Sequence, residues 1–256
     1  MHFRWKQKEE PDSKIVSHLT ECLGVPDKIA LILAQRGVTN YKEAETYFRP
    51  KLTQLHDPFL MKDMDKAVKR LETALQIDEK IMVYGDYDVD GTTSVALVFS
   101  FLTGFTEKAT YYIPDRYDEG YGISKKGIDT AKEQGITLII ALDCGIRSVE
   151  LVKYAKELGI DFIICDHHLP GNKLPDAVAV LDPKRQDCAY PFKELSGCGI
   201  GFKLVQAFNQ NNSREVETLY KYLDLVVVSI ASDIVEMNGE NRILSYYGLK
   251  QINSKP

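Results

Sequence analysis

The chain has 256 residues, 44% apolar and 27% charged, with a net charge of −5, a composition typical of one large or two modest globular domains. No run approaches the roughly 18 uninterrupted apolar residues of a membrane span, and the first residues lack the apolar part of a signal peptide, so the expected location is the cytoplasm. Five cysteines, an odd number without a Cys-x-x-Cys pair, argue against a disulfide framework and a zinc site.

The first 77 residues show helical periodicity and no strand pattern. Apolar residues recur at helical spacing in four stretches, within residues 15–23, 29–34, 41–48 and 64–78. Pro26, Gly37 and Arg49-Pro50 separate the four stretches from one another. We therefore predict a small helical N-terminal region, 1–77, with no chemistry of its own.

From residue 78 the pattern changes to alternating strands and helices. Apolar runs of strand length occupy 81–84, 109–113, 137–142, 161–165 and 177–181, and helical patterns occupy 92–105, 124–134 and 148–158. Repeated strand–helix–strand units build parallel sheets that helices cover on both faces. The second domain, 78–256, is therefore predicted to be α/β, with an open, mostly parallel sheet of five or more strands and helices on both faces.

Three aspartates, Asp86, Asp88 and Asp90, alternate along the stretch between the first strand and the first helix of this domain. In an extended loop, alternate side chains turn the same way, so at least two of these carboxylates can converge. Crowded carboxylates repel one another, and a hard divalent cation such as Mg²⁺ or Mn²⁺ cancels that repulsion. The stretch therefore indicates a metal site.

Three other interpretations of this stretch compete with a metal site in an α/β enzyme. Asp is common in solvated turns for backbone reasons. An EF-hand loop matches over residues 86–91 but not at its twelfth position, which is Leu97 instead of Glu, and a strand instead of a helix precedes it. The run from Asp88 to Thr92 resembles the nucleophile motif of haloacid-dehalogenase-type phosphatases.

Two more strand ends carry residues that bind metals. Asp143 follows the third strand, and Asp166, His167 and His168 follow the fourth. In open parallel sheets the carboxyl ends of the strands meet at one edge, where function gathers. Three such ends together favour one shared site over separate helix caps or satisfied core groups.

Together these motifs resemble those of the DHH phosphoesterase superfamily and, more narrowly, those of the RecJ-type single-stranded-DNA exonucleases. The resemblance rests on 55–67, 85–91, 113–122, Asp143-Cys-Gly145, Asp166-His-His168 with Leu-Pro-Gly behind it, 197–204 and 224–233, in the family's order. Dehalogenase-type phosphatases have no use for paired histidines after a later strand. Small DHH enzymes that degrade nanoRNA or cyclic dinucleotides usually carry a His where this chain has Tyr84.

The resemblance implies two divalent cations, Mn²⁺ or Mg²⁺. Carried over by position, Asp88 holds the first cation with support from Asp86, Asp90 and His167 hold the second, Asp143 bridges both, and Asp233 completes the second. Such a pair lowers the pKa of a shared water and clamps the attacking and leaving oxygens of an in-line displacement at phosphorus. The implied reaction is phosphodiester hydrolysis.

Two residues beside these ligands are expected to take part in catalysis together with Asp143. Asp166 is expected to orient a histidine, as carboxylates often do for metal-ligating imidazoles. His168 is expected to contact the scissile phosphate or the leaving oxygen. The alternative for His168 is a strand-end histidine bonded to backbone.

Two further features are candidate phosphate-binding groups. Arg116 follows the second strand and can fork onto a phosphate, although an ion pair with Asp118 or Glu119 is an alternative. Gly197, Gly199 and Gly201 precede a helical run, so free amides there can receive a phosphate, with tight packing as the alternative.

The implied function is that of the catalytic part of a 5′-to-3′ single-stranded-DNA exonuclease in recombination and repair. Its expected partners are single-stranded DNA and other repair proteins, with no membrane, and it is expected to be a monomer. The alternative is a catalytically inactive DHH-fold scaffold in a replication or repair complex, which the intact ligand set disfavours.

The family's C-terminal substrate-binding domain has no match in this sequence. We therefore expect an N-terminal fragment that is weakly active or inactive alone, with much of the basic DNA-binding surface outside it. The acidic excess after residue 77 fits this expectation. It does not exclude DNA as a partner, because two divalent cations would offset four of the negative charges.

Overall fold

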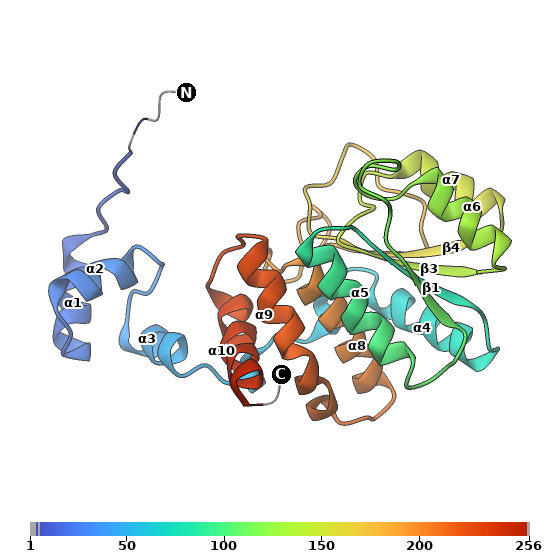
Figure 1. Ribbon diagram of the computed structural model, residues 1–256. Coiled ribbons are helices and arrows are strands. Elements are labelled where there is room, and N and C mark those ends of the chain that lie inside the picture. Colours follow the sequence, from blue (N-terminus) through green and yellow to red (C-terminus); the bar gives the residue numbers. More distant parts are fainter. Residues whose placement is uncertain (1–3, 5, 255–256) are drawn as a thin grey trace. The chain divides into compact units, whose positions relative to one another are not determined.

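Figure 1 shows the computed structural model, which describes residue 4 and residues 6–254. Contacts divide the chain into two compact units, Met1–Gln54 and Leu55–Pro256. This division precedes the predicted boundary at 77/78, because helix α4 (Met64–Gln76) packs against β5 and α8 of the second unit. Within the described ranges, no helix is long and apolar enough to cross a membrane.

The described part of the first unit contains three short α-helices, as its periodicity predicts. They are α1 (Ser13–Leu23), α2 (Asp27–Ala34) and α3 (Tyr41–Phe48). Asn40 caps α3 by accepting a hydrogen bond from the Glu43 amide at 3.0 Å, and α1 ends at Gly24, which adopts a left-handed conformation. A small core of Leu19, Ala30, Leu33, Val38 and Ala44 joins the helices.

The second unit is built on a five-stranded parallel sheet. Its strands are β1 (Ile81–Gly85), β2 (Ala109–Tyr112), β3 (Leu138–Leu142), β4 (Asp161–Cys165) and β5 (Ala179–Leu181), in the spatial order β2-β1-β3-β4-β5. All four pairings are parallel. The predicted α/β class and open sheet are confirmed.

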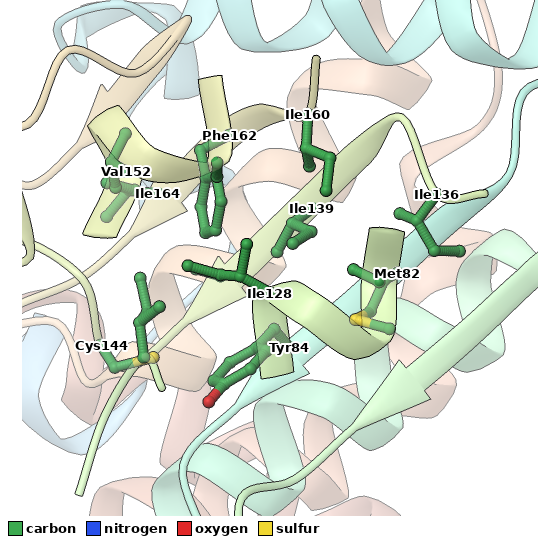
Figure 2. Packing of buried hydrophobic residues seen from close by; sticks show 14 of the residues in the cluster. Met82, Tyr84, Ile128, Ile136, Ile139, Cys144, Val152, Ile160, Phe162 and Ile164 are labelled. Atoms are coloured by element: carbon green, nitrogen blue, oxygen red, sulfur yellow. The ribbon is translucent and has the colours of Figure 1, made fainter. Parts of the chain in front are cut away.

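Helices cover both faces of this sheet, as Figure 1 shows. One face packs against α6 (Lys125–Glu133) and α7 (Val149–Glu157), and this cluster is drawn in Figure 2. The other face packs against α4, α5 (Val89–Leu102) and α8 (Gly197–Asn211). Because both faces are covered, β1 and β3 are buried along their whole length, which explains their uninterrupted apolar sequences.

The remaining elements are helical. In the first unit η1 (Leu52–Gln54) follows α3. In the second unit η2 (Pro58–Leu60), η3 (Val216–Tyr222), α9 (Leu223–Ser232) and α10 (Gly239–Ser254) pack against α8 or against one another. Helix α9 packs against α5 and α10, so the end of α9 lies close to the start of α5 in the fold.

Two helices begin earlier than their apolar patterns predict. Helix α5 begins at Val89 instead of Thr92, because Asp88 caps it by accepting a hydrogen bond from the Gly91 amide at 2.9 Å. Asp90 therefore lies in the first helical turn and not in an extended loop. Helix α8 begins at Gly197 instead of Phe202, because Ser196 is its N-cap.

Candidate metal centre

The register of the sheet brings four aspartates to one edge. Gly85 pairs with Leu142, Leu142 with Cys165, and Cys165 with Leu181, and the residue after each of these strand ends is an aspartate. These four are Asp86, Asp143, Asp166 and Asp182. All four are buried, so the carboxyl edge of the sheet concentrates carboxyl groups away from water.

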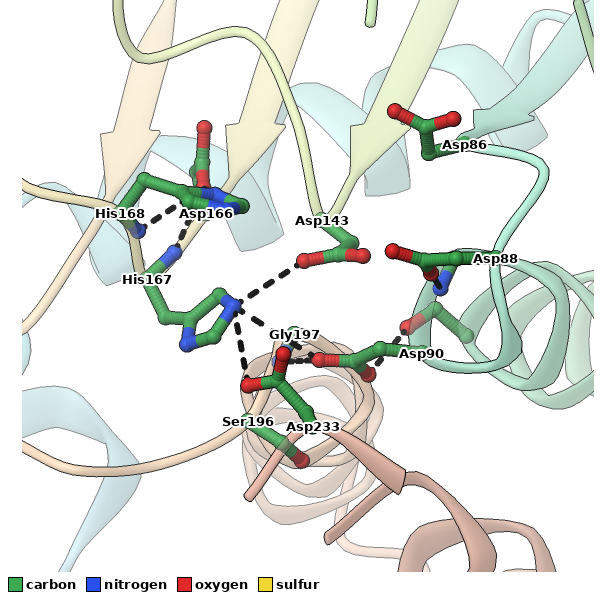
Figure 3. A network of polar contacts seen from close by, with 12 residues as sticks. Asp86, Asp88, Asp90, Asp143, Asp166, His167, His168, Ser196, Gly197 and Asp233 are labelled. Carbon is green, nitrogen blue, oxygen red and sulfur yellow. Dashed lines mark hydrogen bonds and ion pairs between the residues drawn. The ribbon is translucent and has the colours of Figure 1, made fainter. Parts of the chain in front are cut away.

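His167 points one ring nitrogen at three carboxylates (Figure 3). Its Nε2 lies 3.1 Å from Asp143 Oδ1, 3.5 Å from Asp233 Oδ2 and 3.7 Å from Asp90 Oδ2. Neither ring nitrogen has a hydrogen-bond partner among the described residues. An imidazole nitrogen without a hydrogen-bond partner, with three carboxylates around it, forms a set of ligand atoms that suits a divalent metal ion.

Asp143 is a buried carboxylate that has no hydrogen-bond partner among the described residues. It is 1% exposed, and neither of its oxygens has a hydrogen-bond partner in the described part of the chain. Burial, reinforced by the charges of Asp90 and Asp88, raises the pKa of Asp143 to about 11. An isolated buried carboxylate is costly, and a cation is the group that offsets this cost. The site therefore fits a divalent cation.

Two groups of three residues could each hold a metal ion, because within each group the ligand atoms all lie within 4.8 Å of one another. One group is Asp90, His167 and Asp233, and the other is Asp143, His167 and His168. The first group matches the residues assigned to the second cation. In Figure 3 the carboxylate of Asp88 faces that of Asp143 across the site. One oxygen of Asp88 caps α5, which leaves the other for a cation.

Asp86 does not join the other carboxylates. Its Oδ1 accepts a hydrogen bond from the Tyr87 amide at 2.6 Å, and its Oδ2 accepts one from the Gly122 amide at 2.9 Å. Figure 3 shows it apart from the cluster. The structure does not support the predicted ligand role of Asp86. Both of its oxygens are committed to backbone amides, and it anchors the loop that contains Gly122.

The amides at the start of α8 bind Asp90, not an open phosphate position. Gly197 N donates to Asp90 Oδ2 at 2.7 Å, Cys198 N donates to Asp90 Oδ1 at 2.8 Å, and Gly199 N donates to Ser196 Oγ at 3.2 Å. The amides of Gly197 and Gly199 thus already have acceptors inside the protein, which argues against the predicted phosphate-binding role of Gly197, Gly199 and Gly201 at these two glycines. Gly201 lies inside the helix, where an added Cβ would stand 3.3 Å from Val98 and 3.4 Å from Leu142.

Close packing against Asp143 explains why residue 197 is a glycine, and a substitution there tests the site. A Cβ on Gly197 would lie 2.6 Å from Asp143 Cβ, whereas a Cβ on Gly199 would make only ordinary contacts at 3.4 Å or more. We expect Gly197→Ala to displace Asp143 and to weaken Mn²⁺ binding about 10-fold or more. Isothermal titration calorimetry measures this effect, with Gly199→Ala as the matched control in the same helix. Equal affinities for the two variants would contradict the predicted displacement.

Asp166 orders the histidine pair. Its Oδ1 accepts hydrogen bonds from the backbone amides of His167 at 2.7 Å and His168 at 3.1 Å and lies 2.8 Å from His168 Nδ1, while its Oδ2 accepts one from Ile146 N at 2.8 Å. The hydrogen bond to Asp166 raises the pKa of His168, although burial opposes the shift. The His168 side chain is 42% exposed, so a substrate can reach it.

Arg116 makes no ion pair with Asp118 or Glu119 in the described structure. Its guanidinium carbon lies 5.0 Å from the centroid of the Tyr87 ring, and Tyr87 contacts Tyr121 edge to face at 5.9 Å. Tyr121 in turn lies against His168, with ring centroids 6.1 Å apart. Arg116 thus belongs to an aromatic surface that reaches the site, and its phosphate-binding role stays a prediction.

Two serines that the sequence does not mark as site residues form hydrogen bonds beside the site. Ser229 Oγ donates to Asp90 Oδ1 at 2.7 Å, and Ser196 Oγ lies 2.6 Å from Ser229 Oγ. Ser196 could have been found as a helix cap, since serine before the first helical residue is a common N-cap. Nothing local marks Ser229, which is 139 residues from Asp90 in the chain.

Comparisons with known proteins agree with this arrangement. The model of the DHH family, N-terminal domain, matches residues 80–230. The chain is 41% identical over 249 residues to the single-stranded-DNA-specific exonuclease RecJ of Bacillus subtilis (strain 168), covering 97% of this chain and 31% of that protein. The corresponding protein of Escherichia coli (strain K12) is 34% identical over 241 residues, covering 90% of this chain and 41% of that protein.

Solved structures show the same likeness. RecJ from Thermus thermophilus in complex with Mn²⁺ superposes with a TM-score of 0.78 and 26% identity, covering 96% of this chain and 34% of that one. Exonuclease RecJ bound to manganese has a TM-score of 0.71 and 30% identity, covering 80% of this chain and 50% of that one. The chain thus spans between about a third and a half of the length of these proteins.

Proposed function

The chain belongs to the DHH family, and on that premise we propose that it is the catalytic part of a metal-dependent exonuclease that hydrolyses single-stranded DNA from its 5′ end. The observation that carries the proposal is the convergence of Asp90, Asp143 and Asp233 on His167 Nε2. The names of the similar proteins, which are exonucleases specific for single-stranded DNA, support the substrate.

In this proposal, one group of residues holds the cations and another contacts the substrate. Asp88, Asp90, Asp143, His167 and Asp233 hold two divalent cations, Mn²⁺ or Mg²⁺. When bound, these cations activate a water and stabilise the charge that develops on the phosphodiester. His168, oriented by Asp166, contacts the phosphate or the leaving oxygen.

The setting of the reaction belongs to the same proposal. We place the protein in the cytoplasm, where it acts on single-stranded DNA as a monomer, together with other repair proteins, in recombination and repair. The chain spans 31% of the Bacillus relative, so residues outside it are expected to contribute to DNA binding. We therefore expect weak activity or none from residues 1–256 alone.

An inactive scaffold of the same fold is the second candidate. A scaffold has no need of a buried carboxylate whose oxygens lack partners, and Asp143 is such a group among the described residues. The buried Asp143 carboxylate, without hydrogen-bond partners in the part of the chain that the structure describes, therefore favours the enzyme over the scaffold.

Two measurements separate these candidates. We expect two Mn²⁺ ions per chain in calorimetry of residues 1–256, and Mn²⁺-dependent release of nucleotides from 5′-labelled single strands by the protein that contains this chain at full length. Duplex DNA of the same sequence and added EDTA are the controls. Absence of Mn²⁺ binding would favour the scaffold, and equal degradation of duplex would remove the single-strand specificity.

A further inference from the structure

A buried chain of hydroxyl groups stands behind Asp90. Ser229 of α9 is 0% exposed, and its Oγ lies 2.7 Å from Asp90 Oδ1 and 2.6 Å from the Oγ of Ser196. Ser196, also 0% exposed, accepts a hydrogen bond from the Gly199 amide at 3.2 Å as the N-cap of α8. Three helices, α5, α8 and α9, thus meet at one carboxylate.

The direction of the hydrogen bonds between these hydroxyl groups and Asp90 follows from the number of hydrogens that each group has. A hydroxyl has one hydrogen and two lone pairs, and an ionised carboxylate has no hydrogen to give. Ser229 must therefore donate to Asp90, and the short contact between Ser229 and Ser196 takes its hydrogen from Ser196. The result is a one-way chain from Gly199 N–H through Ser196 and Ser229 to Asp90, in which each bond polarises the next.

The two oxygens of Asp90 become unequal as a consequence. Oδ1 accepts from Cys198 N at 2.8 Å and Ser229 Oγ at 2.7 Å, with Ser94 Oγ also 3.5 Å away, so both of its lone pairs are used. Among the described residues, Oδ2 accepts a hydrogen bond from Gly197 N alone, at 2.7 Å, and it faces His167 Nε2 at 3.7 Å. Asp90 can therefore offer a cation one oxygen, Oδ2.

We propose that Ser229, backed by Ser196, is a positioning residue that holds Asp90 as a single-oxygen ligand of the cation beside His167. This inference rests on the proposed metal centre and deepens it. Without the hydroxyl, Oδ1 regains a free lone pair, and the amides of Gly197 and Cys198 alone hold the carboxylate. The cation position beside His167 is then weakened, whereas the position on the Asp88 side keeps its ligands.

The first test is Ser229→Ala, followed by Mn²⁺ titration with calorimetry and electron paramagnetic resonance. We expect one of the two Mn²⁺ sites to weaken about 10-fold or more, as is usual when a partner of a metal ligand is removed. The matched control is Ser245→Ala in α10, which removes a buried hydroxyl that has no hydrogen-bond partner among the described residues. Thermal unfolding of both variants shows whether any loss comes from a damaged fold.

The second test is a double-mutant cycle. Ser196→Ala removes both the helix cap and the hydroxyl behind Ser229, so its effect on Mn²⁺ affinity should shrink when Ser229 is already alanine. Ser124→Ala, which removes the cap of α6, where Ser124 Oγ accepts from the Gly127 amide at 2.8 Å, shows the effect of losing a cap elsewhere. If the effects of Ser196→Ala and Ser229→Ala on Mn²⁺ affinity are additive, the two serines do not act through a shared chain of hydrogen bonds.

The outcomes separate this inference from the proposed function. Unchanged affinity at both Mn²⁺ sites in a folded Ser229→Ala protein overturns the positioning role and leaves the metal centre standing. No Mn²⁺ binding by the unmodified chain overturns the metal centre itself, and the positioning role with it. Selective weakening of one site with an intact fold supports both.

Discussion

Replacing Asp143 by asparagine is expected to reduce the proposed Mn²⁺-dependent hydrolysis of single-stranded DNA about 1,000-fold or more. Asp143 lies between Asp88 and His167, so its oxygens reach both proposed cation positions. A metal ion stabilises the transition state by several kcal/mol, and each 1.4 kcal/mol is about a tenfold change in rate. Asparagine keeps the shape of the side chain but loses the negative charge that holds the cations.

The same substitution is expected to stabilise the metal-free protein. Burial raises the pKa of Asp143 to about 11 from its ordinary value of 3.8. A carboxyl with a raised folded-state pKa loses stability as the pH rises between these two values, because the unfolded chain ionises first. At pH 7 asparagine avoids this loss. If the gain is about 2 kcal/mol, Tm rises by about 4–8 °C for a domain of this size.

Thermal unfolding in EDTA and in Mn²⁺, with hydrolysis of 5′-labelled single strands by the full-length protein, tests both parts. Unmodified protein should gain Tm on addition of Mn²⁺, and Asp143→Asn should not. Asp65→Asn, at an exposed position in α4, changes the net charge equally and should behave as the unmodified protein does. Activity above a tenth of the normal rate in Asp143→Asn would remove the bridging role.

The sheet and the order of its helices could be predicted because they depend on local patterns. Strands such as Leu138–Leu142 are buried on both faces and therefore appear as uninterrupted apolar runs. Parallel pairing then places the strand ends at one edge, which is enough to bring Asp143 and His167 to the same site. The carboxyl edge thus follows from periodicity alone.

The division of labour among the aspartates could not be predicted in the same way. Asp86, Asp88 and Asp90 alternate in sequence, but Asp88 caps α5, and the cap winds the following residues into a helix. Asp86 is left outside, bound to the Gly122 amide, while Asp90 meets the start of α8. These partners come from distant segments, and spacing within one loop carries no information about them.

Replacing Lys203 by methionine is expected to destabilise the fold by about 3–5 kcal/mol, the usual result of removing one partner of a buried ion pair. Lys203 Nζ lies 2.7 Å from Glu240 Oε1, and the two side chains are 0% and 1% exposed. Lys203 also donates to the His56 carbonyl at 2.9 Å, and Glu240 accepts from His56 N at 2.9 Å and Tyr190 OH at 2.6 Å. Without Lys203, Glu240 keeps a buried negative charge with no cation.

Thermal unfolding measures this effect, and at about 2–4 °C per kcal/mol Tm should fall by at least about 6 °C. The double variant Lys203→Met with Glu240→Gln should recover much of the loss, because the amide still accepts from His56 or Tyr190 but leaves no charge buried. Lys156→Met is the control, since Lys156 and Asp176 form an exposed pair, 60% and 78% accessible, which contributes at most about 1 kcal/mol. If Lys203→Met unfolds within about 1 °C of that control, packing and not the ion pair joins α8 to α10.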